Sequence, residues 1–143
     1  MGLNQNPGQY AGSYAKSSPT QLGSETTWSQ ASSATRAMGG VKTDGTLWLW
    51  GQNDFGRLGQ NSETNYSSPV QVPGTNWQEL CMGQDYVIAL KTDGTLWSWG
   101  DNVDGELGIN DKTSRSSPTQ IPGTNWVTGF RAGTKASAFI KVL

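Results

Sequence analysis

The chain has 143 residues, with ten Lys and Arg against eleven Asp and Glu, and therefore a formal net charge of -1. This balance argues against a nucleic-acid-binding protein, which needs a basic face. The chain has no histidine and one cysteine, Cys81, which excludes His-based catalytic triads, His or Cys-cluster metal sites and an intrachain disulfide. We therefore expect no catalytic residue, no metal and no cofactor.

The first twenty residues lack the apolar core of a signal peptide, and no segment approaches the ~20 apolar residues of a membrane span. We expect a protein of the virion or the cytoplasm, without a membrane partner. Only 15% of the residues are charged, and Gly, Ser, Thr, Asn, Gln and Trp are frequent. This composition favours turns and strands over helices.

The sequence repeats at an interval of 49 residues. Trp28, Trp77 and Trp126 are spaced by that interval, and the phrase KTDGTLWLWG at Lys42 returns as KTDGTLWSWG at Lys91. A repeat of this length indicates stacked supersecondary units. We treat residues 1–143 as one repeat domain with units at approximately 2–50, 51–99 and 100–143.

Each unit begins with a loop rich in Gly and Asn. The loop WGQNDFGRLGQN (50–61) matches WGDNVDGELGIN (99–110), and GLNQNPGQYAG (2–12) is a weaker first copy. An SSPxQ segment, a PGTNW-type turn and an apolar run follow, and then an Asp-Gly pair leads into TLWxW. Asp-Gly between two strand-like runs predicts a hairpin, for which we expect a type I′ turn with positive φ at both residues.

The TLWxW segment predicts a strand that is covered on both faces. Trp48 and Trp50 point to one side, while Leu47 and Leu49 point to the other. Apolar residues on both faces are typical of strands packed between neighbouring sheets, as in a propeller blade. Because all seven tryptophans fall at repeat positions, we interpret them as core residues.

These glycine-spaced loops, the Gly83 position before an Ala-Leu pair and the DGTLWxWG ending resemble the regulator of chromosome condensation repeat family, particularly its bacterial and phage members. The family often has a histidine after the mid-repeat glycine, whereas Gly83 is followed by Gln84. The resemblance implies a β-propeller, typically of seven blades. Only three units are present, and the third ends at AFIKVL without a TDGTLWxWG segment. We predict an all-β fold of three propeller-blade-like repeats, an incomplete or open β-propeller unless other chains complete it.

Open blade edges predict partners. We expect self-association or association with other structural proteins, with an apolar strand edge at Ala138 to Leu143. An open fan within a larger assembly and a fragment of a longer product are the alternatives. The candidate interface consists of residues that break the repeat or lie at this edge: Phe55, Arg57, Tyr66, Tyr86, Arg115, Phe139, Ile140, Val142 and Leu143. Tyr and Arg are favoured at binding hot spots.

The function predicted from these features is a non-enzymatic structural or interaction module, in a virion as a phage decoration, tail or attachment component. The alternative is a cellular or surface module that binds protein, or glycan through exposed tryptophans. A third hypothesis, which the founding family member implies, is guanine-nucleotide exchange with chromatin binding. It is the weakest of the three, because the net charge is near neutral and the propeller ring is incomplete.

Overall fold

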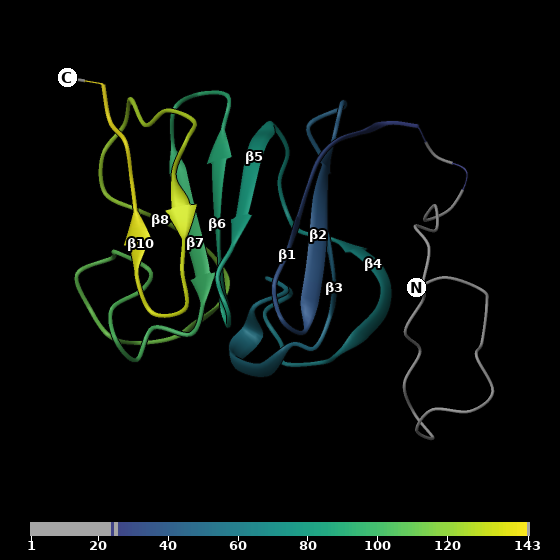
Figure 1. The fold of residues 1–143 in the computed structure, drawn as a ribbon, viewed down its shortest axis with the longest axis horizontal. Helices are drawn as coiled ribbons and strands as arrows, with labels where there is room; N and C mark the ends of the chain where they lie inside the picture. The colour runs from purple at the N-terminus through teal and green to yellow at the C-terminus, as the bar shows by residue number, and fades with distance from the viewer. Residues whose placement is uncertain (1–23, 25, 143) are drawn as a thin grey trace.

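The computed structural model describes residue 24 and residues 26–142. Apart from one 3-10 turn, η1 (Asp54–Gly56), every regular element of this part of the chain is a β-strand, which confirms the all-β prediction. Figure 1 shows three sheets side by side in chain order. Their arrangement is that of successive blades in an open propeller.

The first two sheets have the same four-stranded antiparallel plan, with the strands paired in chain order. Blade 1 contains β1 (Trp28–Ser33), β2 (Ala37–Lys42), β3 (Leu47–Gly51) and β4 (Tyr66–Gln71). Blade 2 contains β5 (Trp77–Met82), β6 (Tyr86–Lys91), β7 (Leu96–Gly100) and β8 (Arg115–Gln120). Both share a register shift after the first residue of the first strand, so the sequence repeat is a repeat of detailed structure.

The third unit is smaller in the described part of the chain. It consists of β9 (Arg131–Ala132) and β10 (Ser137–Ala138), with an isolated bridge between Trp126 and Lys141. The bridge corresponds to the pair that Trp77 forms with Lys91 in blade 2. The third unit therefore continues the blade pattern.

The hydrophobic core lies between the sheets and not inside any one of them. At the first junction Leu47 and Leu49 of blade 1 pack in one cluster with Leu80 and Trp99 of blade 2. A second cluster joins the opposite face of blade 2, including Leu96, to the third unit. Each sheet is stable because a neighbour covers it, which is the principle of repeat architectures.

The predicted side-chain alternation in the TLWxW strands is confirmed by the cross-strand pairs. Met38 faces Trp50 and Val41 faces Leu47 across β2 and β3. In β7 both faces are covered, and Trp99 has no exposed surface. In β3 the leucine face is fully buried, but Trp50 on the other face is only half-buried. Blade 1 thus has one face that the described residues do not close.

The Asp-Gly turns differ from the expected type I′ geometry. Gly45 and Gly94 have φ angles of 80° and 77°, but Asp44 and Asp93 do not have positive φ. The Gly45 amide donates to the Lys42 carbonyl (2.9 Å), and the Lys42 amide donates to the Thr46 carbonyl (2.8 Å). This pattern belongs to a three-residue loop with glycine at the left-handed position. The loop therefore contains Thr43 as well as Asp44 and Gly45, and it has three residues where the Asp-Gly pair alone would give two.

Tryptophan and lysine side chains fasten each Asp-Gly hairpin to its blade. The Lys91 ammonium lies 4.6 Å from the ring centroid of Trp77 and 4.7 Å from that of Trp97. Trp77 also contacts Trp99, with 5.9 Å between ring centroids. In blade 1, Lys42 lies over Trp28 and Trp48 in the same way. These repeated contacts give the recurring tryptophans a structural role.

The sheets and the sequence units are offset from one another. The sheets begin at Trp28 and Trp77, whereas the second and third sequence units begin at residues 51 and 100. A blade in space therefore combines the end of one sequence unit with the beginning of the next. The division of the chain into units at those positions stays a prediction.

Candidate functional site

The loops that follow β3 and β7 are organised by one buried asparagine each. The Asn53 amide nitrogen Nδ2 donates to the carbonyls of Ser62 (2.8 Å) and Thr64 (2.9 Å), and its Oδ1 accepts from the Leu58 amide (2.7 Å). Asn53 has no exposed surface. A single side chain thus ties both halves of the loop together.

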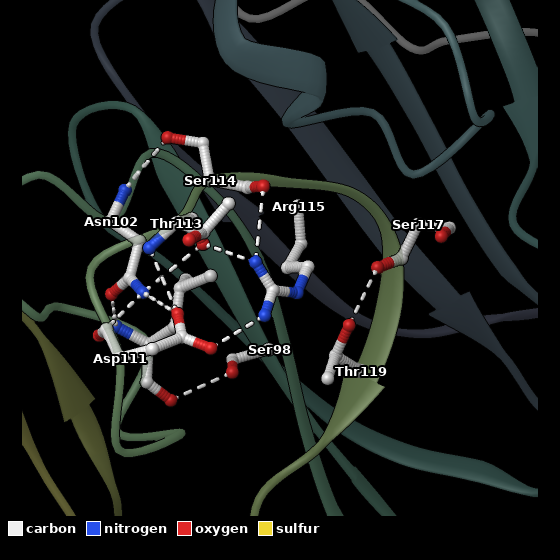
Figure 2. Close-up of polar contacts among 9 residues, drawn as sticks. Ser98, Asn102, Asp111, Thr113, Ser114, Arg115, Ser117 and Thr119 are labelled. Carbon is white, nitrogen blue, oxygen red and sulfur yellow. Dashed lines mark hydrogen bonds and ion pairs between the residues drawn. The ribbon is translucent and has the colours of Figure 1, made fainter.

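Asn102 repeats this arrangement after β7. It donates to the carbonyls of Asp111 (2.9 Å) and Thr113 (3.2 Å) (Figure 2), and the Leu107 amide donates to its Oδ1 (3.0 Å). Ser98 stands where blade 1 has Leu49, and its hydroxyl donates to the Leu107 carbonyl (2.8 Å). The one substitution in the repeated phrase therefore serves the local loop.

Arg115 lies at the end of the same loop. Its guanidinium pairs with Asp111 (2.6 Å) and donates to the Thr113 carbonyl (2.7 Å), as Figure 2 shows. Hydrogen bonding from the Thr113 amide, then the Arg115 charge, holds the pKa of Asp111 below its usual value. The contacts of Arg115 stabilise its own loop.

At the first blade junction, the loop after β3 lies directly on blade 2. The Trp99 indole Nε1 donates to the Arg57 carbonyl (2.9 Å), and the Asn61 amide donates to the Ser116 carbonyl (2.8 Å). Gly56 approaches β8 so closely that a Cβ there would meet the Ser116 Cα at 2.4 Å. The loop is therefore an integral part of the junction.

Arg57 spans the junction with its side chain buried. Its guanidinium pairs with Asp85 (2.6 Å) and more weakly with Asp54 (3.4 Å), and it donates to the Gln84 carbonyl (3.1 Å). The Arg57 side chain is 2% exposed, against 26% for Asp85. Arg57 thus joins the two blades within the chain.

Tyr86 joins the two units at the second junction. Its hydroxyl donates to the Ala136 carbonyl (2.7 Å) and accepts from the Gly133 amide (3.0 Å). Burial raises the pKa of the Tyr86 phenol, and the donors around its oxygen oppose that shift. The hydroxyl ties blade 2 to the β9–β10 turn.

The remaining predicted interface residues differ widely in exposure. Tyr66 is half-buried against the first core cluster, and Phe139 contacts Trp126 edge-on, with 5.8 Å between ring centroids. Phe55 is 45% exposed, and its φ of 61° is uncommon for a bulky residue. Ile140 and Val142 are the exposed members at the chain's edge, and Leu143 lies outside the described residues.

Met38 and Trp50 form a further pair of candidate residues, on the outer face of blade 1 and away from the third unit. Met38 is 37% exposed beside Trp50 on the outer face of blade 1. They line an open cavity of about 610 Å³, which Ser67, Ser68 and Pro69 of β4 border. Sequence reasoning missed this face because it treated every repeated tryptophan as core. The signal that could have revealed it is the polar first strand of blade 1, WSQASS against WQELCM.

Residues 24 and 26–142 contain no group of three or more His, Cys, Asp or Glu side chains placed to hold a metal ion. In that same range, no helix has the length and apolar character needed to cross a membrane.

Several solved structures resemble the chain, including the following three. Human WBSCR16 matches with a TM-score of 0.71 and 21% identity, over 81% of this chain and 31% of that chain. Prp20p from Saccharomyces cerevisiae, described with its binding to Gsp1p and histones, matches with a TM-score of 0.70 and 16% identity, over 86% of this chain and 33% of that one. A chain in the structure of Kap60 bound to yeast RCC1 (Prp20) matches with a TM-score of 0.65 and 20% identity, over 80% of this chain and 27% of that chain.

These likenesses establish the propeller fold, and the chain spans about a third or less of each matched chain. No curated protein sequence matches it. The profile of the regulator of chromosome condensation (RCC1) repeat matches residues 44–90 and 93–140, and a second profile of that repeat matches residues 77–106. Since these matches cover more than half of the chain, including all of blade 2, the chain belongs to the regulator of chromosome condensation (RCC1) repeat family.

Proposed function

We propose that the chain is a non-enzymatic structural and interaction module that assembles end to end with further copies of itself. The RCC1 repeats and the propeller neighbours support a repeat and interaction module. The observation that carries self-association is the match between the two exposed end faces and the two halves of the junctions buried inside the chain.

One end face lies on the third unit. Ile140 has the position in its unit that Val41 has in blade 1 and Leu90 has in blade 2. Val41 and Leu90 are each 1% exposed because the next sheet covers them, whereas Ile140 is 50% exposed. This face therefore presents an apolar surface of the kind that receives another blade.

The other end face is the outer side of blade 1. Met38 and Trp50 correspond to Val87 and Trp99 of blade 2, which have no exposed surface because blade 1 covers them. The Ile140 face of one copy and the Met38 face of the next are thus the two sides of one junction. Their contact would be heterologous, or head to tail.

Paired charge substitutions test this arrangement. Ile140→Asp disables one face and Met38→Asp disables the other, because each places a carboxylate in an apolar contact. Each variant alone should sediment as a monomer. An equimolar mixture should form dimers and nothing larger, since each variant retains one intact face. Analytical ultracentrifugation measures all three samples.

Val103→Asp is the matched control, because Val103 is 62% exposed in the loop after β7 and belongs to neither end face. This variant should associate as the unchanged chain does. Mixed variants that stay monomeric would refute the head-to-tail contact. Association of Ile140→Asp equal to that of the unchanged chain would refute the role of the Ile140 face.

The more specific setting that we propose is the virion, with the chain as a decoration, tail or attachment component. The repeat architecture and the composition with few charges and no histidine support this proposal. Mass spectrometry of phage particles purified on a density gradient tests it. Peptides of the chain should sediment with the particles, and their recovery only among free proteins would contradict the assignment.

Two of the similar solved structures are of proteins described with protein partners. Prp20p is described with binding to Gsp1p and histones, and yeast RCC1 with binding to Kap60. Because this chain spans only part of those proteins, we take from them protein binding as a class of function and no particular partner.

A further inference from the structure

We infer that a small acidic cavity at the second junction binds the guanidinium group of an arginine side chain from a partner protein. The cavity, of about 60 Å³, lies where the β5–β6 turn, the loop after β7 and the β9–β10 turn meet, and its lining includes Asp85, Asp101, Asp104 and Glu106. It belongs to neither end face, so the inference does not depend on the self-association proposed above.

Glu106 is the buried carboxylate of this cavity. It is 5% exposed, and its Oε2 accepts a hydrogen bond from the Asp104 amide (2.9 Å). Within residues 24 and 26–142, no lysine or arginine forms an ion pair with Glu106, and its Oε1 accepts no hydrogen bond. A buried carboxylate is costly without an opposite charge and further hydrogen bonds. Oε1 therefore offers a cationic donor a strong contact.

The other carboxylates of the lining already have partners. Asp85 pairs with Arg57 (2.6 Å), Asp104 pairs with Lys135 (2.9 Å), and Asp101 accepts hydrogen bonds from its own loop. Lys135 is the one cationic residue in the lining, against four carboxylates. An incoming cation would thus meet a surplus of negative charge, which favours its approach.

The first junction shows how the same positions hold a guanidinium group. Arg57 and Asp85 pair there, and the arginine side chain is 2% exposed. Their counterparts at the second junction are Glu106 and Lys135, so the signs of the two charges are reversed. Lys135, however, pairs with Asp104 and is 73% exposed. The second junction therefore has a carboxylate at the buried position, while its lysine stays at the surface.

A guanidinium group suits this cavity better than a metal ion does. The carboxylates do not form the tight cluster of three that a metal needs, in the part of the chain that the structure describes. Guanidinium has N–H donors along its whole planar edge, so it can reach acceptors on different sides and bind a carboxylate through two hydrogen bonds. Thr134 and Gln84 add polar groups to the lining.

The size of the cavity points to a protein as the source of that group. Sites for whole small molecules have volumes of roughly 300–1,000 Å³. A cavity of about 60 Å³ has room for a head group alone, so the rest of the ligand must lie outside it. An arginine of a partner protein has this form, because its aliphatic stem can lie against Val103 at the surface.

Ligand-observed NMR on the full-length chain tests the inference. The probe is the peptide acetyl-Gly-Arg-Gly-amide, and its control is the same peptide with citrulline, which keeps the side-chain shape but has no charge. Saturation transfer to the arginine side-chain protons should reach a plateau as peptide is added. The citrulline peptide should bind about tenfold more weakly, because charged hydrogen bonds are stronger than neutral ones. Equal binding of the two peptides, or none, would overturn the inference.

Glu106→Gln locates the site, because glutamine keeps an acceptor for the Asp104 amide and removes the charge. This variant should bind the arginine peptide about tenfold more weakly. Glu63→Gln is the matched control, since Glu63 is exposed and lies outside the cavity lining. It should bind as the unchanged chain does, and equal affinities of the two variants would place the peptide elsewhere. If Glu106→Gln does not fold, the citrulline comparison still decides.

Lys135→Gln tests whether the chain's own lysine competes for the cavity. Removing this cation should strengthen binding of the arginine peptide. Binding by this variant alone would mean that Lys135 enters the cavity of the unchanged chain, and it would refute an external arginine. Tighter binding of free arginine than of the peptide would contradict a protein as the source. Self-association can fail in ultracentrifugation while the peptide result stands, and the reverse also holds.

Discussion

Arg57 illustrates how single residues hold the blades together. Its guanidinium is buried between two loops and pairs with Asp85 across the first junction. Arg57→Met should lower the free energy of unfolding by about 2 kcal/mol, because removing one partner of a buried pair leaves the other unpaired. The loss is moderated by the partial exposure of Asp85. Urea denaturation measures it.

Arg115→Met provides the comparison. The Arg115–Asp111 pair is 29% and 40% exposed, and exposed pairs contribute on the order of 0.5 kcal/mol. An equal loss in both variants would contradict the junction role of Arg57.

Tyr86 makes the second junction sensitive to alkaline pH. Since burial raises the pKa of its phenol above 10.0, the folded state favours the protonated form. The stability from this group is fully present below the unfolded-state pKa of about 10 and is lost as pH rises through the folded-state pKa. The free energy of unfolding should therefore fall above pH 10.

Tyr86→Phe should be less stable at neutral pH, because it loses the hydrogen bonds to Ala136 and Gly133, but its stability should decline less between pH 9 and 11. Denaturation curves across this range provide the measurement. A decline equal to that of the unchanged chain would refute the assignment to Tyr86.

Sequence reasoning selected Arg57 and Tyr86 as interface candidates because they break the repeat and belong to residue types favoured at hot spots. The structure places both in junctions inside the chain. The composition of a junction between blades resembles that of an interface between proteins, so residue type alone does not separate the two. Only burial, which depends on the neighbouring sheet, distinguishes them.

At the scale of the elements, the glycines of the long loops provide the sharpest test of the junction. Gly56→Ala should be strongly destabilising, because its φ is 74° and the added Cβ would meet the Ser116 Cα at 2.4 Å. Gly105 is the same position in the next loop, with φ of 90° and nothing within 4 Å of an added Cβ. Gly105→Ala should cost only the backbone strain, about 1 kcal/mol.

Gly56→Ala should lose roughly 2 kcal/mol more than Gly105→Ala in the free energy of unfolding, which is the typical cost of overpacking a close contact. Chemical denaturation of the two variants compares them directly. Losses of the same size would mean that the loop can move away from β8 without consequence.

The strands and their facing side chains could be predicted from sequence, because the spacing within TLWxW fixes the two faces locally. The turn type could not, since Asp-Gly occurs in both two- and three-residue loops and the difference lies in the pairing of Lys42 with Thr46. The open face beside Met38 was also missed, because whether Trp50 is covered depends on a neighbouring element and not on its own strand.

At the scale of the whole molecule, the proposed end-to-end association depends on two end faces that reproduce a buried junction in exposed form. The open propeller was predicted from the number of repeat units, whereas the proposed contact between Met38 of one copy and Ile140 of another depends on the spatial equivalence of the blades. Sequence indicated that edges exist, while the structure indicates which residues on them correspond.

Sedimentation equilibrium of the unchanged chain over a wide range of concentration tests the proposed end-to-end association. The mass should rise with concentration from the 15.3 kDa of one chain through its integer multiples. A mass that stays at 15.3 kDa at every concentration would contradict it.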